Sequence, residues 1–190
     1  MNIDKHLIEK YNVPVPRYTS YPPANFFDNK FGNKEYIQAI EASNHEQPVN
    51  ISIYIHIPFC PKICHYCGCN THHTRDKQKM RVYVDAVKKE LQMVRQYLDP
   101  LRKVSQIHWG GGTPNSLPAE MVEEIMAVIH SNFAFIANPE IAIECHPAML
   151  DAVYIEALAN SGFNRISLGI QDFNPEVLTN VNRDAPEIPV

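Results

Sequence analysis

The sequence predicts an α/β fold in which helices cover a parallel sheet. Stretches with apolar residues at every second position alternate with stretches whose apolar residues recur at spacings of three and four. Repeated alternation of strand and helix is typical of parallel βαβ units with right-handed crossovers. The unusual residues of the chain follow the strands, and ligand sites of such folds lie beyond the carboxyl ends of the strands.

The first 48 residues differ in character from the rest of the chain. They contain turn signals and two aromatic-rich stretches, residues 16–23 and 26–27, and their prolines disfavour regular structure. We therefore predict an arm over residues 1–48 that is extended at first and includes a short helix near residues 34–42. Residues 49–190 are predicted to form the core domain.

The core is predicted to begin with a strand at residues 51–57, where isoleucines alternate with more polar side chains. An amphipathic helix follows, with an apolar stripe formed by Tyr83, Val84, Val87, Leu91, Val94 and Leu98. Four basic residues open this helix and are expected to face solvent: Arg75, Lys77, Lys79 and Arg81.

The alternation then repeats twice. A strand is predicted at residues 104–109, then a helix that opens near Ser116 and Pro118 and buries Met121, Ile125, Val128 and Ile129. A short strand is predicted at residues 140–144, a helix at 150–160 that stops at Gly162, and a strand at 164–170.

Composition limits the classes of function. The chain has 190 residues, 45% hydrophobic residues and a net charge of −4, which indicates a soluble globular protein of one domain, or of one domain and an arm. The acidic balance disfavours a nucleic-acid partner. The sequence shows neither a signal peptide nor an apolar run long enough to span a bilayer, so we expect a cytoplasmic protein without a membrane partner.

Four of the five cysteines lie within ten residues: Cys60, Cys64, Cys67 and Cys69. The CxxxCxxC spacing lets three thiolates converge on one metal centre, and three thiolates on a cubane iron–sulfur cluster leave one iron open to a substrate or cofactor. The spacing is too uneven for paired CxxC zinc sites, although thiolates also suit zinc, so a zinc-binding module stays an alternative. The odd cysteine count and the length disfavour disulfides. Cys145, the fifth, is expected to be a small buried residue.

Two further strands end in unusual residues. Three glycines and Thr113 at residues 110–113 allow close backbone approach to a ligand, and a tight turn after the strand is the alternative explanation. The stretch matches neither the dinucleotide motif GxGxxG nor the phosphate motif GxxxxGK[ST]. Glu144 ends the next strand and could hold a ribose hydroxyl or an ammonium group, or form a surface ion pair. The last strand leads to Gln171 and Asp172.

These features resemble the radical S-adenosylmethionine superfamily, for which CxxxCxxC is the cluster motif. Nearly all of the chain is similar to the N-terminal portion of the oxygen-independent coproporphyrinogen III oxidase family. The shared motifs are Tyr11-Asn12, Pro16-Arg-Tyr-Thr-Ser-Tyr-Pro22, Tyr54-Ile-His-Ile-Pro-Phe-Cys60, Cys67-Gly-Cys69-Asn70, His108-Trp-Gly-Gly-Gly-Thr-Pro114 and the stretch from Gly162 to Phe173. Cys69 and residues 16–22 are the specific parts, because the related heme chaperones generally lack both.

The resemblance implies a partial parallel (β/α) barrel of the radical S-adenosylmethionine type and a set of cofactor sites. A [4Fe-4S] cluster would be held by Cys60, Cys64 and Cys67. One S-adenosylmethionine would contact Tyr54, Gly111 and Glu144. A second S-adenosylmethionine would contact Tyr66, Gly112, Thr113, Gln171 and Arg183. No catalytic side chain beyond this set is implied.

The resemblance also implies an activity in heme biosynthesis. Reductive cleavage of S-adenosylmethionine would give methionine and a 5′-deoxyadenosyl radical, which takes a hydrogen atom from a propionate of coproporphyrinogen III. Loss of carbon dioxide and one electron leaves a vinyl group, and two such steps give protoporphyrinogen IX. The implied partners are the porphyrinogen and an electron donor such as a reduced flavodoxin or ferredoxin. The family implies a monomer.

Two features depart from the family. At residues 144–147, where the family commonly has Glu-Val-Asp-Pro, the chain has Cys145 and His146 in the middle positions. This keeps two alternatives open: a radical S-adenosylmethionine paralogue with another substrate, and a heme or iron–sulfur carrier of the chaperone type. Family members are also more than twice as long. Four parallel strands cannot close a barrel, so we expect an incomplete substrate site and an unpaired edge able to self-associate.

Overall fold

The computed structural model describes residues 5–12 and 26–186. The chain forms two compact units, residues 1–36 and 37–190. The aromatic stretch at residues 16–23 lies outside the described residues, and the division predicted after residue 48 stays a prediction. None of the helices in the described ranges is both long enough and apolar enough to cross a membrane.

The arm contains more helix than predicted. Helix α1 (Lys5–Tyr11) replaces the extended chain expected there, because the thirteen residues before the first proline contain neither proline nor glycine. Helix α2 (Asn33–Ser43) confirms the short helix predicted near residues 34–42.

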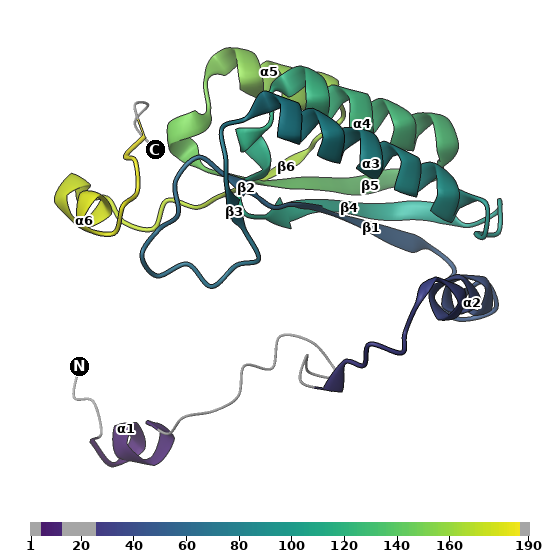
Figure 1. The fold of residues 1–190 in the computed structure, drawn as a ribbon, viewed down its shortest axis with the longest axis horizontal. Coiled ribbons are helices and arrows are strands. Elements are labelled where there is room, and N and C mark those ends of the chain that lie inside the picture. Colours follow the sequence, from purple (N-terminus) through teal and green to yellow (C-terminus); the bar gives the residue numbers. More distant parts are fainter. Residues whose placement is uncertain (1–4, 13–25, 187–190) are drawn as a thin grey trace. The chain divides into compact units, whose positions relative to one another are not determined.

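The core is a four-stranded parallel sheet of β1 (Ile51–Ile57), β4 (Lys103–Gly111), β5 (Ala134–Cys145) and β6 (Arg165–Leu168), in the order β1-β4-β5-β6. Helices α3 (Lys77–Arg95), α4 (Ala119–Asn132) and α5 (Ala152–Asn160) lie on one face of the sheet, as Figure 1 shows. The predicted parallel α/β fold is thus confirmed as a partial barrel with one face covered by helices.

The two faces of the sheet differ because side chains alternate along each strand. Ile55, Ile57 and Trp109 are buried in the core formed with the helices, whereas Tyr54 is exposed and His108 is half-buried. Burial of each large apolar side chain contributes about 1.5–3 kcal/mol, which favours this register over a slip by one residue. The face without helices therefore carries polar side chains along its length.

Some boundaries differ from the prediction. Strand β5 begins at Ala134, because its first residues pair with β4 before an irregularity in the register. Strand β6 has four residues, fewer than predicted, since it pairs with β5 alone among the described strands. Leu98 lies beyond the end of α3 but still packs against the core. Gly162 follows α5 with a φ of 93°, a left-handed conformation that suits glycine and explains the predicted stop.

Three short elements complete the core. Strands β2 (Phe59–Cys60) and β3 (His72–His73) form a separate two-stranded parallel sheet, and α6 (Pro175–Asn180) follows the last strand. None of the three was predicted. Strands β2 and β3 have only two residues each, too few to show a repeating pattern in the sequence.

Candidate functional site

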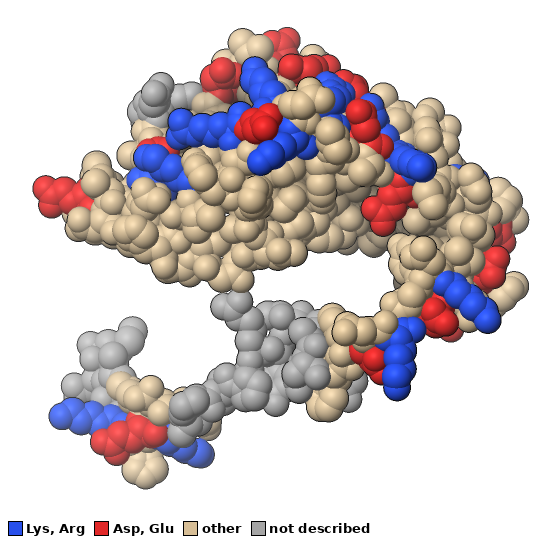
Figure 2. Space-filling model, in the orientation of Figure 1, with Lys and Arg blue, Asp and Glu red and all other residues tan. Residues whose placement is uncertain are grey.

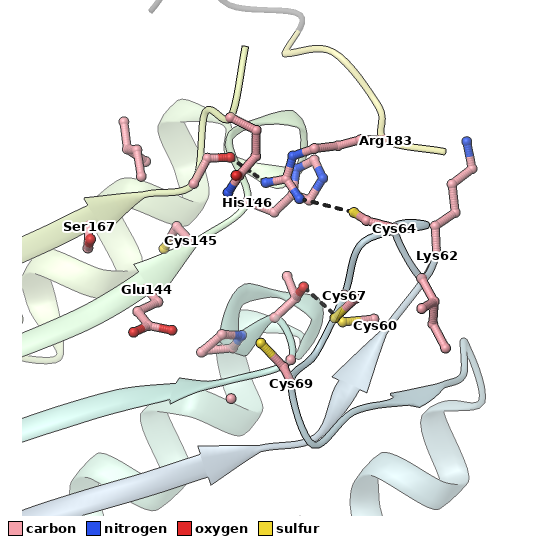
Figure 3. A pocket seen from close by; sticks show the side chains of 18 of the residues that line it. Cys60, Lys62, Cys64, Cys67, Cys69, Glu144, Cys145, His146, Ser167 and Arg183 are labelled. Carbon is pink, nitrogen blue, oxygen red and sulfur yellow. Dashed lines mark hydrogen bonds between the residues drawn. The ribbon is translucent and has the colours of Figure 1, made fainter. Parts of the chain in front are cut away.

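A pocket of about 290 Å³ lies at the carboxyl ends of the strands, where they meet the cysteine loop, residues 60–69 (Figure 3). Ten of the predicted site residues line it: Cys60, Cys64, Tyr66, Cys67, Gly111, Gly112, Thr113, Glu144, Gln171 and Arg183. Cys69, Cys145 and His146 line it as well. The convergence follows from topology, since parallel strands deliver their following loops to one edge of the sheet.

The cysteine loop is anchored at both its base and its tip. At the base, the backbone carbonyl of Cys60 accepts a hydrogen bond from the Thr74 N–H at 3.0 Å. At the tip, the His65 N–H donates to the carbonyl of Val181 just beyond α6, at 3.1 Å. These bonds hold the loop as a fixed wall of the pocket.

The cysteine thiols are free, and polar groups surround them. Thr71 Oγ1 and Thr113 Oγ1 lie 3.0 and 3.2 Å from Cys60 Sγ, and Arg183 Nη1 lies 3.5 Å from Cys64 Sγ. Hydroxyl and guanidinium donors of this kind stabilise negatively charged sulfur. Within the described ranges, no three His, Cys, Asp or Glu side chains are arranged around one common point. In a cubane each thiolate binds its own iron, so the sulfurs need not meet at one point.

The glycine loop, residues 110–113, packs directly against the cysteine loop. Gly111 has a φ of 120°, and the Gly112 N–H donates to the carbonyl of Ile57 at 2.8 Å. A Cβ on Gly112 would lie 2.5 Å from Thr71 Oγ1 and 3.0 Å from Cys60 Sγ. Gly112 is therefore needed for the close approach of the two loops, and the same backbone also lines the pocket.

Glu144 is held from the neighbouring strand. His108 Nε2 lies 3.1 Å from Glu144 Oε1, and because a carboxylate only accepts, the imidazole N–H donates. The Tyr54 ring stacks on His108, with ring centres 6.0 Å apart and an interplanar angle of 12°. Tyr54 and Glu144 flank Gly110, where a Cβ would lie 3.1 Å from the Tyr54 hydroxyl and 3.2 Å from Glu144 Oε2. Tyr54, the one predicted site residue outside the pocket lining, thus lies beside the carboxylate.

A second link joins this face to the cysteine loop. His56 Nε2 lies 2.8 Å from the carbonyl oxygen of Asn70, so this nitrogen carries the proton and donates. The other ring nitrogen, Nδ1, can then accept from the Tyr54 hydroxyl at 3.1 Å. Hydrogen bonds therefore link Tyr54 through His56 to the residue after the cysteine loop, and the stacked rings of Tyr54 and His108 lead on to Glu144.

Arg183 lines the pocket between β6 and the cysteine loop. One terminal nitrogen bonds the carbonyl of Gly169, whereas Nε is buried without a hydrogen-bond partner among the described residues. The other terminal nitrogen lies beside Cys64 Sγ, so the guanidinium joins the end of β6 to the cysteine loop along the wall of the pocket.

The two residues that depart from the family also lie here. Asn115 bonds both backbone groups of His146, at 2.8 and 3.0 Å, and His146 lies next to Arg183 in Figure 3. Burial, with a smaller effect from Arg183, lowers the pKa of His146 to about 4, so its imidazole is neutral at neutral pH. Burial, with a smaller effect from Glu144, raises the pKa of Cys145 to about 12. The expectation of a buried Cys145 is confirmed.

Three supporting residues were not predicted: His56, Thr71 and His108. The sequence carried one usable signal, since His108 pairs with Tyr54 in the register of β1 and β4 and so shares its face. Thr71 had no comparable signal, because its contact with Cys60 depends on the fold of the loop.

Comparisons with known proteins agree on one family. The model of the Radical SAM superfamily matches residues 54–187. The oxygen-independent coproporphyrinogen III oxidase of Synechocystis sp. is 46% identical over 181 residues, which cover 95% of this chain and 39% of the relative. The enzyme of the same name from Escherichia coli (strain K12) is 45% identical over 184 residues, 97% of this chain and 39% of the relative.

A solved structure supports the fold. The coproporphyrinogen III oxidase of Escherichia coli, described as a radical SAM enzyme, aligns with a TM-score of 0.85 at 40% identity. The alignment covers 98% of this chain and 40% of that chain. The chain thus spans about two fifths of the length of the relatives it matches.

Proposed function

The chain belongs to the Radical SAM superfamily, whose members work with a [4Fe-4S] cluster and S-adenosylmethionine, and we propose that it provides the cofactor-binding part of an oxygen-independent coproporphyrinogen III oxidase. The main support for this proposal is that the cysteine loop, the glycine loop, Glu144 and Arg183 line one pocket. Similarity along 95% of the chain to relatives of that name supports the choice of substrate.

The residues present fit the cluster. Three thiols from one anchored loop face the pocket, and the hydroxyls of Thr71 and Thr113 lie beside Cys60 Sγ. We assign Cys60, Cys64 and Cys67 as the ligands. Cys69 lies beside them, and burial, with a smaller effect from Cys67, raises the pKa of its thiol.

The residues also fit S-adenosylmethionine. Glu144, held by His108, would accept hydrogen bonds from an ammonium or hydroxyl group, with Tyr54 and Gly111 beside it. Arg183, a cation in the pocket lining, would donate to a carboxylate of a second molecule. The second S-adenosylmethionine would also contact Tyr66, Gly112, Thr113 and Gln171, which line the same pocket.

When bound, the cluster and S-adenosylmethionine supply a one-electron reductive cleavage that starts removal of hydrogen from a substrate propionate. The chain binds and orients these groups, and the fixed loops keep their positions during the reaction. Each of two propionates would lose a hydrogen atom, one electron and its carboxyl group as carbon dioxide, and its two remaining carbons would form a vinyl group of protoporphyrinogen IX.

The partners proposed are the porphyrinogen and an external one-electron donor such as a reduced flavodoxin or ferredoxin. Five free thiols suit a reducing compartment, so we place the protein in the cytoplasm. A monomer is expected for the complete protein. The exposed residues of β6 would allow the 190-residue chain to self-associate through this edge.

An anaerobic assay tests the proposal. The reconstituted chain is compared with the same chain joined to the C-terminal portion of the Synechocystis relative. Both should release 5′-deoxyadenosine with dithionite, and only the longer protein should form protoporphyrinogen. An intact cluster without any cleavage of S-adenosylmethionine would favour a carrier function. Equal porphyrinogen turnover by both proteins would contradict an incomplete substrate site.

One observation favours a second candidate. His146 is neutral and lies in the pocket where the resembled family commonly has an acid. A radical S-adenosylmethionine paralogue with another substrate would be indicated if the longer protein cleaves S-adenosylmethionine and leaves coproporphyrinogen III unchanged.

A further inference from the structure

A second hollow lies on the other side of the cysteine loop. Its volume is about 350 Å³, and it is lined by Pro61, Thr74, Arg75, Lys77, Met80, Ser116, Pro118, Met149 and Asp184. It shares no lining residue with the main pocket, although Pro61 is bonded directly to Cys60. A single stretch of chain therefore separates the hollow from a proposed cluster ligand.

The wall between the two hollows is closely connected to Cys60. The Thr74 N–H donates to the backbone carbonyl of Cys60 at 3.0 Å, and His73 Nδ1 lies 3.3 Å from the same oxygen. Arg75 follows these residues directly in the chain. A protein docked over the hollow would thus reach the cluster ligand through one peptide bond or one hydrogen bond.

The rim of this hollow is basic in an acidic chain. Residues 60–81 contain five Lys or Arg residues and one Asp, a formal net charge of +4, whereas the whole chain carries −4. Arg75, Lys77 and Lys79 are exposed. Figure 2 shows Lys and Arg side chains gathered over α3, with several Asp and Glu side chains among them. We call Arg75 and Lys77, which line the hollow, and the nearby Lys79 the basic rim. The acidic lining residue, Asp184, is paired with Lys62.

The charges of the basic rim are not neutralised within the fold. None of the three side chains forms an ion pair or hydrogen bond with the described residues, whereas Arg81 and Lys88 both bind Glu124, at 2.6 and 2.7 Å. Lys77 and Lys79 also occupy the first turn of α3, which contains no acidic residue. Asp76 caps this end of α3 and favours the helix dipole, whereas cations here oppose it, so helix stability does not account for Lys77 and Lys79.

We propose that the basic rim and the hollow beside it dock an acidic electron-transfer protein that delivers the electron for cleavage of S-adenosylmethionine. The inference rests on the proposed function and adds the surface at which the electron donor binds. Each cleavage consumes one electron, which the donor loses as it passes to its one-electron-oxidised form. Charge complementarity identifies the partner as acidic, because unneutralised cations speed the encounter with a negatively charged surface.

A pair of double variants tests the surface. R75Q/K77Q removes two rim charges, and K89Q/K103Q removes two exposed charges elsewhere, one late in α3 and one at the start of β4. Both lower the net charge equally, and neither pair forms an ion pair with described residues. The probe is an acidic flavodoxin, reduced for electron transfer and oxidised for binding.

The first readout is the rate at which the reconstituted cluster is reduced. With reduced flavodoxin at low ionic strength, R75Q/K77Q should be roughly tenfold slower than the parent, and the difference should shrink at high salt. K89Q/K103Q should match the parent. Dithionite, a small reductant, should reduce all three proteins at one rate.

The second readout is binding of oxidised flavodoxin to the cluster-free chain by calorimetry, which needs no catalysis. R75Q/K77Q should bind more weakly than K89Q/K103Q. Equal reduction rates and equal flavodoxin affinities in the two variants would refute the proposed docking surface. A parent protein that does not bind flavodoxin at low salt would refute it as well. A parent whose cluster accepts no electron from dithionite contradicts the proposed function instead, and the binding measurement then decides the surface alone.

Discussion

His108 Nε2 donates a hydrogen bond to Glu144 Oε1 across 3.1 Å, so a residue of β4 fixes the carboxylate at the end of β5. The Tyr54 ring stacks on the same imidazole from β1. Three parallel strands therefore determine the position of one carboxylate. This arrangement would let Glu144 meet its ligand without reorganisation, which is how a rigid sheet improves binding.

Replacement of His108 by alanine should weaken binding of S-adenosylmethionine to the reconstituted protein about fivefold, the effect of one lost hydrogen bond of about 1 kcal/mol. The H108Q variant keeps a donor and should bind more tightly than H108A. Calorimetry measures the affinity, and iron analysis should show an unchanged cluster. Q106A is the matched control, because Gln106 lies on the same face of β4 but bonds Glu140. An equal loss in Q106A would rule out a specific role for His108.

A second prediction concerns the cluster ligands. Anaerobically reconstituted protein should contain about four iron atoms per chain, and serine at position 60, 64 or 67 should abolish the cluster. Cys69→Ser should retain most of the iron. Cys145→Ser is the control, because Cys145 lines the pocket at the end of β5, away from the cysteine loop. Iron loss in C69S as large as in the other three variants would refute the three-ligand assignment.

The sequence was informative wherever a local pattern decides structure. Alternating residues set β1 at the predicted bounds, and Gly162 ends α5 because only glycine readily adopts its φ of 93°. The meeting of the cysteine loop, the glycine loop and Glu144 was predictable as well, since it follows from parallel strands alone.

Contacts that depend on tertiary packing were not predictable. Thr71 reaches Cys60 only because β2 and β3 pair, and two-residue strands leave no periodic signal. His108 reaches Glu144 only in the observed register of β4 and β5. The extended arm predicted at residues 5–11 was wrong, because the prolines that motivated it lie further along the chain.

A third prediction concerns the contact between the two loops. Gly112→Ala should impair cluster assembly, because the new Cβ would lie 2.5 Å from Thr71 Oγ1 and 3.0 Å from Cys60 Sγ and the Phe59 carbonyl. Iron content after reconstitution and thermal unfolding measure the effect. Gly32→Ala is the control, since its Cβ would meet only the flexible Glu35 carboxylate at 3.4 Å. Normal iron content in G112A would show that the cysteine loop tolerates displacement.

The last prediction concerns pH and the helix layer. Glu124 of α4 accepts hydrogen bonds from Arg81 and Lys88 of α3. These two bonds lower the pKa of Glu124 from 4.5 to about 2, and the bond from Arg81 has the larger effect. A carboxyl with a lowered folded-state pKa stabilises the fold above its ordinary pKa and loses that contribution as pH falls toward 2. Glu124→Gln should therefore reduce the free energy of unfolding at neutral pH, by about 1 kcal/mol or less because the pair is partly exposed.

Urea titrations from neutral pH to about pH 2 measure this free energy for parent and variant, and the difference between the two proteins should vanish in acid. Glu123→Gln, a change of an exposed neighbour, should have little effect at any pH. A difference for E124Q that persists unchanged at the acid end would assign the loss to packing instead of charge.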